Sequence, residues 1–571
     1  MMRTRSPRKV DDIPIAPSLY SLSNKMGNSL LAVRDINHIY IVVERIEKEM
    51  KPISELQQIK GDAYEYYNTS SQQDSLFEKI FLVDEIMDEI KSPDKYFVIG
   101  EKGSGKTAYA VYLSNHPSAD LKSKIKLVEN TVYDKFVTMK QNKSLDMSTY
   151  KDIWVNMIYL VLCEEIRDLI QNNPLKYRHY MSLTKAIEKF YSNAFKPEFI
   201  NALEFVDKSN ASVNTMIENG VFSLAGNAEE EFTQKYVEQS YQLSLMKLKD
   251  GFEKALQPLN MRNKFILFID GIDARPTHIS NKEYIDCLKG LVNAVITLNC
   301  SFLKGLGIKI ALLIRPDILY SMSIHNMNQK IRDNAVLLKW VTTYKNYRES
   351  KLFTIADSYL AKQQDIPYEC GVCWDSYFPY KVRNKYNKRL GRHLSDDSFV
   401  GLLRYSLYKP RDILTMLNEF VSVGTGVSFK YRDFDNIIAN YSEYLKGELK
   451  DYMLIYMSEE DYSNFYNFFD LFDNVKFSYD EFVKIHKKFL ESLKDLNRAI
   501  PYKMETPAET LQLLYDSNII CCEEQVYKFG KLRNIMSWSY KERNYANIQP
   551  EVKRKGTYRF HSAYARAFKI L

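Results

Sequence analysis

The sequence predicts an α/β core built on a parallel sheet, followed by a helical lid and a C-terminal, α-rich region. Two observations predict the core. A strand, a glycine-rich loop and a helix follow one another over residues 96–113, and two apolar runs, the second interrupted by Lys309 alone, occupy residues 265–269 and 308–314. Strands that are covered on both faces of a parallel sheet read as continuous apolar runs. The helical patterns between them are typical of parallel strands joined by crossovers.

The glycine-rich loop fits the pattern GxxxxGK[ST] at every defined position. Its residues are Gly100, Glu101, Lys102, Gly103, Ser104, Gly105, Lys106 and Thr107. Glycine lets the backbone turn sharply and approach a phosphate, and the following helix directs its positive end at the same place. The pattern predicts that Lys106 reaches the β- and γ-phosphates of a nucleotide and that the Thr107 hydroxyl ligates Mg²⁺.

Acidic residues follow the first apolar run, at Asp270 and Asp273. A side chain at the C-terminal end of a parallel strand faces the crevice in which ligands bind. We expect Asp270 to be the Walker B carboxylate, which holds Mg²⁺ directly or through water. Asp273 is the candidate to orient or activate the attacking water. A buried strand that happens to end in an acidic turn is the alternative.

Two segments resemble known families. Residues 270–273, with the sequence DGID, resemble the DGxD form of Walker B in NACHT and other STAND-type signalling ATPases, although Ala274 replaces the Glu that usually follows. Residues 409–418 resemble the helix with Pro-Arg and Asn found after the core of KAP-type and Orc-like ATPases. The resemblance covers about residues 76–420. It implies a P-loop NTPase core with the ASCE strand order.

The resemblance also implies roles for two arginines. In these ATPases an extra strand lies between the two Walker strands, and Arg315, which ends the run 308–314, fits the residue that senses the γ-phosphate there. Arg411 would be a second sensor from the lid, on a helix whose first turn suits Pro410. An ordinary surface arginine and a helix start without a ligand are the respective alternatives. ATP is the expected nucleotide, and the chain lacks the transmembrane insertion of KAP proteins.

The motifs divide the chain into four expected regions. They are an N-terminal tail and helix (1–75), a P-loop ATPase core (76–345) with a helical insertion at about 170–250, a helical lid (346–425) and a C-terminal helical domain (426–571). The apolar pattern predicts a helix from Leu30 to about Tyr67 and a second helix from Leu76 to Ile90. The insertion is either a regulatory or oligomerisation element or a passive helical elaboration. In the last region, a helix capped by Thr506 precedes strands at 519–527 and 556–561, which is the outline of a winged helix.

A basic segment with interleaved aromatic residues lies between those two strands. It contains Lys528, Lys531, Arg533, Lys541, Arg543 and 553–555, with Trp538, Tyr540 and Tyr545 among them. Such a segment can grip phosphates and stack on bases, so it is a candidate DNA contact. Packing against a neighbouring domain, or a solvated charged face, is the alternative.

Composition narrows the class of protein. An apolar content of 45%, a charged content of 26% and a net charge of +7 describe an ordinary soluble globular chain, with no strong argument for nucleic acid. Seven cysteines without regular spacing favour a cytoplasmic location. No apolar run approaches the length that spans a membrane, so no membrane contact is expected. The flanking regions show no nuclease, protease or deaminase constellation.

The expected function is Mg²⁺-dependent ATP binding and hydrolysis that drives a conformational or assembly switch. The resemblance places such switches in anti-phage or stress signalling, with a homo-oligomer formed on nucleotide binding and a separate effector protein as partners. A DNA-binding ATPase resembling origin-recognition or transposition regulators is the alternative. An inert nucleotide-binding scaffold is disfavoured, since a mere binder needs no second carboxylate at Asp273.

Overall fold

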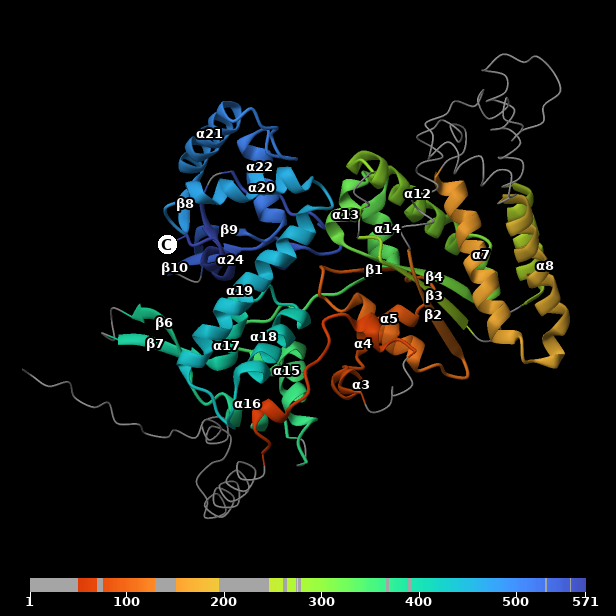
Figure 1. Ribbon diagram of the computed structural model, residues 1–571, viewed down its shortest axis with the longest axis horizontal. Coiled ribbons are helices and arrows are strands. Elements are labelled where there is room, and N and C mark those ends of the chain that lie inside the picture. The colour runs from red at the N-terminus through yellow and green to blue at the C-terminus, as the bar shows by residue number, and fades with distance from the viewer. Residues whose placement is uncertain are drawn as a thin grey trace, which may run out of the picture.

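A computed structural model describes the greater part of the chain (Figure 1). The described residues are 50–68, 75–128, 150–194, 246–259, 264–273, 275, 279–365, 369–387, 392–528, 531–554 and 556–570.

Five parallel strands form the central sheet. They are β1 (Phe97–Ile99), β2 (Leu121–Leu127), β3 (Lys264–Asp270), β4 (Ile308–Ile314) and β5 (Ala335–Leu337). Their order is β2-β3-β4-β1-β5, so β4 lies between β1 and β3. The two apolar runs are β3 and β4, and every residue of β4 is buried. The prediction of an α/β core on a parallel sheet is therefore confirmed.

Helices cover both faces of this sheet (Figure 1). One face carries α5 (Lys106–Asn115), and the other carries α7 (Tyr150–Ile170) and α12 (Asn281–Cys300). Within β3, Ile266 and Phe268 join the core that contains α5, whereas Leu267 and Ile269 join the core that contains α12. This double burial explains why β3 and β4 have no polar alternation.

Only the two ends of the predicted insertion are described. The helix α8 (Tyr177–Ala194) packs against α7, and a further helix covers residues 246–256. Residues 195–245 lie outside the described part of the chain, as does the tail before residue 50.

Two predictions about the segments before β1 are wrong. The expected helix over residues 76–90 is divided into α3 (Leu76–Ile80) and α4 (Glu85–Lys91), because Asp84 is extended and accepts hydrogen bonds from the Tyr109 hydroxyl at 3.0 Å and the Lys351 ammonium at 2.6 Å. The helix expected to reach residue 67 is replaced, over the described residues 50–67, by two short 3₁₀ turns at η1 (Ile53–Glu55) and η2 (Ala63–Tyr66).

Side chains of the lid explain this second difference. Asn418 accepts a hydrogen bond from the Ile59 amide at 3.1 Å and donates to the Ile59 carbonyl at 2.7 Å. The Lys51 amide donates to Gln364 at 3.0 Å, and the Ile53 amide to the Gly426 carbonyl at 3.0 Å. Several backbone groups of this segment are thus paired with the lid and with Gly426, so they need no partner within a helix.

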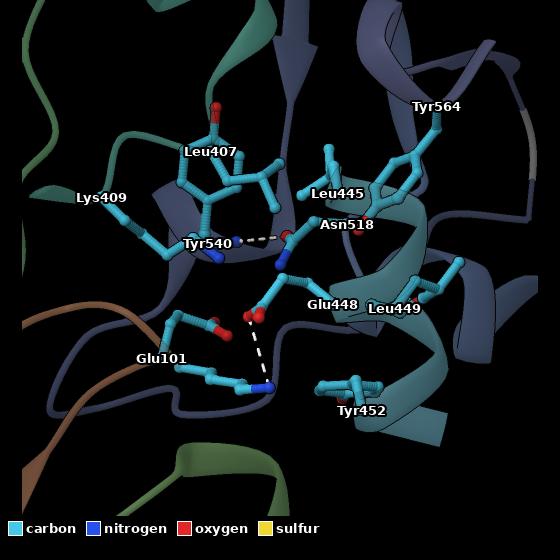
Figure 2. A pocket seen from close by; sticks show the side chains of 12 residues that line it. Glu101, Leu407, Lys409, Leu445, Glu448, Leu449, Tyr452, Asn518, Tyr540 and Tyr564 are labelled. Carbon is cyan, nitrogen blue, oxygen red and sulfur yellow. Dashed lines mark hydrogen bonds and ion pairs between the residues drawn. The ribbon is translucent and has the colours of Figure 1, made fainter. Parts of the chain in front are cut away.

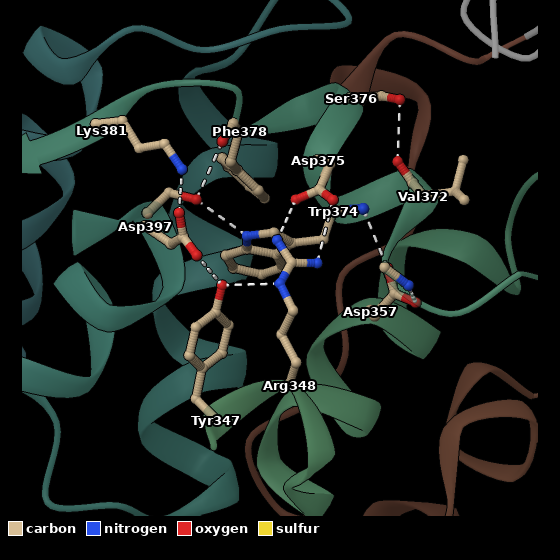
Figure 3. Close-up of polar contacts among 12 residues, drawn as sticks. Tyr347, Arg348, Asp357, Val372, Trp374, Asp375, Ser376, Phe378, Lys381 and Asp397 are labelled. Carbon is tan, nitrogen blue, oxygen red and sulfur yellow. Dashed lines mark hydrogen bonds and ion pairs between the residues drawn. The ribbon is translucent and has the colours of Figure 1, made fainter. Parts of the chain in front are cut away.

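The lid is mainly helical and contains one hairpin. Its elements are η7 (Tyr347–Glu349), α15 (Lys351–Ala361), α16 (Val372–Tyr377), β6 (Lys381–Asn387), β7 (Arg392–Asp397), α17 (Ser398–Tyr405) and α18 (Pro410–Val423). A polar network joins them (Figure 3). Arg348 makes two hydrogen bonds to Asp375, at 2.6 and 3.1 Å, and the Tyr347 hydroxyl donates to Asp397 at 2.5 Å. The helix α18 begins at Pro410, as predicted.

A long helix, α19 (Tyr431–Met453), leads from the lid into the C-terminal region. This region contains α20 (Glu459–Asn467), η8 (Phe468–Leu471), β8 (Lys476–Ser478), α21 (Tyr479–Asp495), α22 (Pro507–Asp516), β9 (Ile520–Lys528), β10 (Lys531–Ser537), α23 (Ser539–Glu542), β11 (Thr557–Phe560) and α24 (Ser562–Ala567). Its strands form an antiparallel sheet of order β10-β9-β11-β8. The predicted cap at Thr506 and the strands near 519–527 and 556–561 are confirmed. None of the described helices has the length and apolar character needed to cross a membrane.

A buried histidine joins this region to the lid and should make stability depend on pH. The His561 ring lies 3.1 Å from the Ser406 carbonyl, and burial lowers its pKa to about 4. Since the unfolded chain binds this proton more tightly, stability is full above the ordinary pKa and falls as the pH drops through the window between 6.5 and 4. We expect a loss of about 2 kcal/mol between pH 7 and pH 5 from this group.

Urea unfolding of the wild type and of His561→Gln at both pH values measures this contribution. Glutamine cannot titrate, so the variant should lose less stability than the wild type between the two pH values. An equal loss in both proteins would show that other groups carry the acid sensitivity.

Candidate functional site

The glycine loop (residues 100–107) runs from the end of β1 to the first turn of α5. Gly103 and Gly105 have φ angles of +84° and +93°, which side chains rarely adopt. A Cβ on Gly100 would lie 2.2 Å from the Ser104 hydroxyl oxygen. The backbone of the loop therefore requires glycine at these positions, and it places the start of α5 beneath a concave turn.

Lys106 is buried at the centre of this turn. Its ammonium donates hydrogen bonds to the carbonyls of Gly100 at 3.0 Å and Glu101 at 3.3 Å. Burial lowers the pKa of Lys106, while the charges of Asp273 and Asp270 act to raise it. Both carboxylates are thus close enough to stabilise the ammonium form.

The predicted magnesium ligands meet directly. The Thr107 hydroxyl donates to the Asp270 carboxylate at 2.5 Å, although the two residues come from α5 and β3. Asp270 also accepts from the Gly271 amide at 2.8 Å, and burial raises its pKa. A hydroxyl and a carboxylate are oxygen ligands of the kind Mg²⁺ prefers, with water and substrate phosphates completing its shell. The residues present therefore fit Mg²⁺.

A larger protein cage for a metal is absent from the described residues. They contain no group of three or more His, Cys, Asp or Glu side chains that could hold an ion. Few protein ligands are the usual arrangement for Mg²⁺ that is bound together with phosphates.

Asp273 lies on the turn after β3 and is partly exposed. The turn is held from two sides. The Tyr284 hydroxyl of α12 donates to the Ile272 carbonyl, and the Arg275 guanidinium donates to the carbonyls of Ile279 at 2.5 Å and Ile455 at 2.6 Å. Arg275 thereby ties this turn to the chain that follows α19. No sequence motif marks Arg275 as a positioning residue.

Arg315 follows β4 and is only 2% exposed. Its guanidinium donates to both oxygens of Asp317, at 3.1 and 2.6 Å, and lies 4.3 Å from the ring centre of Tyr452 on α19. The Tyr456 hydroxyl donates to the same Asp317 at 2.5 Å. The alternative of an ordinary surface arginine is wrong, because this side chain is buried in an ion pair. Its role as a γ-phosphate sensor stays a prediction.

Arg411 lies directly against the glycine loop. Its amide donates to the Gly103 carbonyl at 3.3 Å, and a Cβ on Gly103 would approach the Arg411 Cβ to 2.9 Å. One guanidinium nitrogen is 3.7 Å from the Glu448 carboxylate on α19. The lid helix α18 thus begins where the sequence places it, beside the loop.

The structure brings all the predicted site residues to one edge of the sheet. The charges of Asp270, Asp273, Arg315 and Arg411 all act on the pKa of Lys106. This edge is formed by the carboxyl ends of β1, β3 and β4, as expected for the crevice of a parallel sheet.

Trp340, just after β5, is a site residue that sequence reasoning missed. Its indole N–H donates to the Ser104 carbonyl at 2.9 Å, and its ring lies beside Gly105. It supports the outer side of the loop. A buried tryptophan after a strand is an ordinary core residue by pattern, so no signal distinguished it.

The central part of the candidate DNA segment is built into the interior. Trp538 and Tyr540 are buried, and Arg543 is buried in an ion pair with Glu101 of the glycine loop. The Lys541 ammonium lies 4.3 Å from the ring centre of Tyr408 in the lid. This corrects the expectation for these residues, because buried rings cannot stack on bases. Arg533 lies on the exposed edge strand β10 and Lys553 is paired with Glu524 at 2.7 Å.

Comparisons of the chain with family models, with curated proteins and with solved structures return no match.

Proposed function

We propose that the chain is a Mg²⁺-dependent P-loop ATPase that uses ATP to drive a conformational switch. The contact of Thr107 with Asp270 carries this proposal, since it joins the end of the glycine loop to the acidic end of β3. The position of β4 between β1 and β3 supports the ASCE strand order, in which an extra strand separates the two Walker strands.

The chemistry assigned to the residues follows from their places. The loop amides and Lys106 would bind the β- and γ-phosphates, and Thr107 and Asp270 would hold Mg²⁺. When bound, Mg²⁺ neutralises charge on the phosphate oxygens. Asp273 would accept a hydrogen bond from the attacking water and orient it in line with the γ-phosphate. The new bond forms between this water and the γ-phosphorus as the bond to ADP breaks.

Arg411 and Arg315 give the site its switching character in this proposal. Arg411 starts the lid helix α18, and Arg315 is packed against Tyr452 of α19. Contacts of either arginine with the γ-phosphate would exist only before hydrolysis and would favour a different arrangement of lid and core. The resemblance extends the proposal to self-assembly in the ATP-bound state and to a separate effector protein.

The test is ATP turnover by the purified protein with and without Mg²⁺, beside Lys106→Ala and Asp273→Asn. We expect Mg²⁺-dependent turnover that Lys106→Ala abolishes. Asp273→Asn should lower turnover by at least about tenfold, because a residue that activates the attacking water contributes at least this much to the rate. Asp273→Asn should still bind ATP, because asparagine preserves the shape of the side chain.

Duplex DNA at low and high salt is the second arm of this test. Unchanged turnover supports the switch. Stimulation that high salt removes would favour the DNA-linked alternative. Binding without turnover in the wild type would contradict the hydrolytic role of Asp273.

A further inference from the structure

The two charged variable residues of the glycine loop are both held by the C-terminal part of the chain. Glu101 pairs with the buried Arg543, in the segment after β10. Lys102 pairs with Asp451 at 2.9 Å and with Glu448 at 3.4 Å, both on α19. The pattern GxxxxGK[ST] does not specify these two positions, so phosphate binding alone does not explain their opposite charges.

We propose that these ion pairs form a charge clamp on the glycine loop, and that ATP binding and closure of the clamp oppose each other. The charge clamp consists of Glu101 with Arg543 and of Lys102 with Glu448 and Asp451. The inference rests on the proposed function, and it assigns the regulation of that site to the C-terminal region.

Glu448 supplies the first reason for this opposition. It lies 3.4 Å from Lys102 of the loop and 3.7 Å from Arg411 beside the loop. Glu101 and Glu448 line the same small pocket between the loop, α19 and the C-terminal region (Figure 2). A triphosphate in the loop would compete with Glu448 for these cations and would repel both carboxylates.

Arg543 supplies the second reason. It is only 6% exposed, and its guanidinium also donates a hydrogen bond to the Asp516 carbonyl at 3.0 Å. A buried charge that loses its partner is strongly unfavourable, so Glu101 cannot withdraw while Arg543 stays in place. Movement of Glu101 is therefore coupled to release of Arg543.

The backbone around Arg543 is fastened to the same part of the core. The Lys339 ammonium donates to the carbonyls of Lys541 at 2.8 Å and Arg543 at 3.0 Å, and the Leu337 amide donates to the Tyr545 hydroxyl at 3.1 Å. Since β5 ends at Leu337, the segment 538–548 is docked beside the loop as one unit. Release of Arg543 would remove one of the contacts that hold this unit to the core and leave the bonds of Lys339 and Leu337 to open next.

The coupling must be reciprocal, which gives the test. If ATP weakens the clamp, variants that weaken the clamp must bind ATP more tightly. Arg543→Gln and Glu448→Gln remove one charge each from the clamp and leave the loop unchanged. Arg566→Gln is the matched control, because Arg566 pairs with Asp435 at 2.9 Å between α24 and α19, outside the clamp.

The dissociation constant for Mg²⁺-ATP is measured by titration calorimetry, with Lys106→Ala as the variant without a phosphate site. We expect both clamp variants to bind about tenfold more tightly than the wild type and Arg566→Gln to match the wild type. In the wild type, ATP should increase hydrogen exchange over residues 538–548. Unchanged affinity in both folded clamp variants, or unchanged exchange on ATP binding, would overturn the clamp.

Two further outcomes separate this inference from the proposed function. If the wild type and Lys106→Ala show no difference in ATP binding, the proposed function fails. Hydrogen exchange over residues 538–548 in Arg543→Gln and Glu448→Gln without nucleotide then shows only whether the ion pairs hold this segment. If Arg543→Gln does not fold, Glu448→Gln decides the result, since Glu448 is 21% exposed and its loss strands no buried charge.

Discussion

Replacement of Asp270 by asparagine is expected to lower ATP turnover by about 100-fold or more, the scale of a lost electrostatic contact in a transition state. The same substitution should raise the stability of the nucleotide-free protein. Turnover should fall because asparagine keeps the shape and one of the two acceptor oxygens but loses the charge that would hold Mg²⁺. Stability should rise because the carboxylate is buried, and only 7% of Asp270 is exposed.

The sign of the stability effect follows from the pKa of Asp270. Burial raises this pKa in the folded protein, so the folded chain binds the proton more tightly than the unfolded chain does. The stabilising contribution of such a group is complete below its unfolded pKa and is lost as the pH rises through its folded pKa. At neutral pH the ionised carboxylate therefore lowers the free energy of unfolding. Asparagine in its place should raise that free energy by on the order of 1 kcal/mol.

Thermal unfolding without nucleotide and steady-state ATP turnover measure the two effects. Asp286→Asn is the control, because Asp286 is exposed on α12 and should change neither quantity. A variant with wild-type turnover would remove Asp270 from the site. A variant that loses stability would show that the carboxylate is compensated by a contact that asparagine cannot make.

Asp357→Ala is expected to destabilise the lid by about 2–4 kcal/mol, because two buried amides would lose their acceptor. Asp357 is fully buried on α15, and it accepts hydrogen bonds from the amides of Gly371 at 2.7 Å and Trp374 at 3.0 Å (Figure 3). These amides belong to the start of α16, whose Gly371 has a φ of +88°. The carboxylate therefore orients α16 and the Trp374 ring within the lid core.

Urea unfolding followed by tryptophan fluorescence measures this loss. Asp357→Asn should fall between the wild type and Asp357→Ala, since it keeps one acceptor oxygen. Asp365→Ala is the control, because the side chain of Asp365 is 86% exposed in its pair with Lys51. A change below about 1 kcal/mol in Asp357→Ala would show that water replaces the lost acceptor.

The sequence predicts best those parts of the site that a single segment encodes. The spacing of glycines, Lys106 and Thr107 requires a loop before a helix, and the run before Asp270 has the apolar character of a doubly covered strand. The contact of Thr107 with Asp270 follows because both lie at the carboxyl edge of one parallel sheet. Local chemistry and a general rule of sheet topology are sufficient here.

Elements without a repeated pattern could not be predicted. The strand β8 spans only Lys476–Ser478, and β6 (Lys381–Asn387) is mostly polar, with Val382 as its buried apolar residue. Each of these strands forms by pairing with a partner strand that is distant in sequence or that also lacks a clear pattern. Tertiary context therefore decides whether they form. The division between α3 and α4 likewise depends on partners of Asp84 that the local sequence does not contain.

The basic segment shows a second limit of prediction from sequence. Its composition is that of a solvated, phosphate-binding face, yet Arg543 is buried against Glu101 and Tyr540 is buried near Tyr408. A nucleic-acid-binding face and a buried contact within the chain require the same residue types. A cation can pair with a nucleic-acid phosphate or with a carboxylate of the same chain. Only the three-dimensional partner distinguishes them.

The contact between Glu101 and Arg543 has a consequence for the order of events during protein synthesis. The ribosome releases the glycine loop and the strands around it long before Arg543 is made. If the loop binds nucleotide as proposed, a nascent core would meet cellular nucleotide while its loop is still uncovered. Because a bound triphosphate would oppose the charge clamp, the last segment of the chain would then dock over the loop only after that nucleotide has been hydrolysed or released.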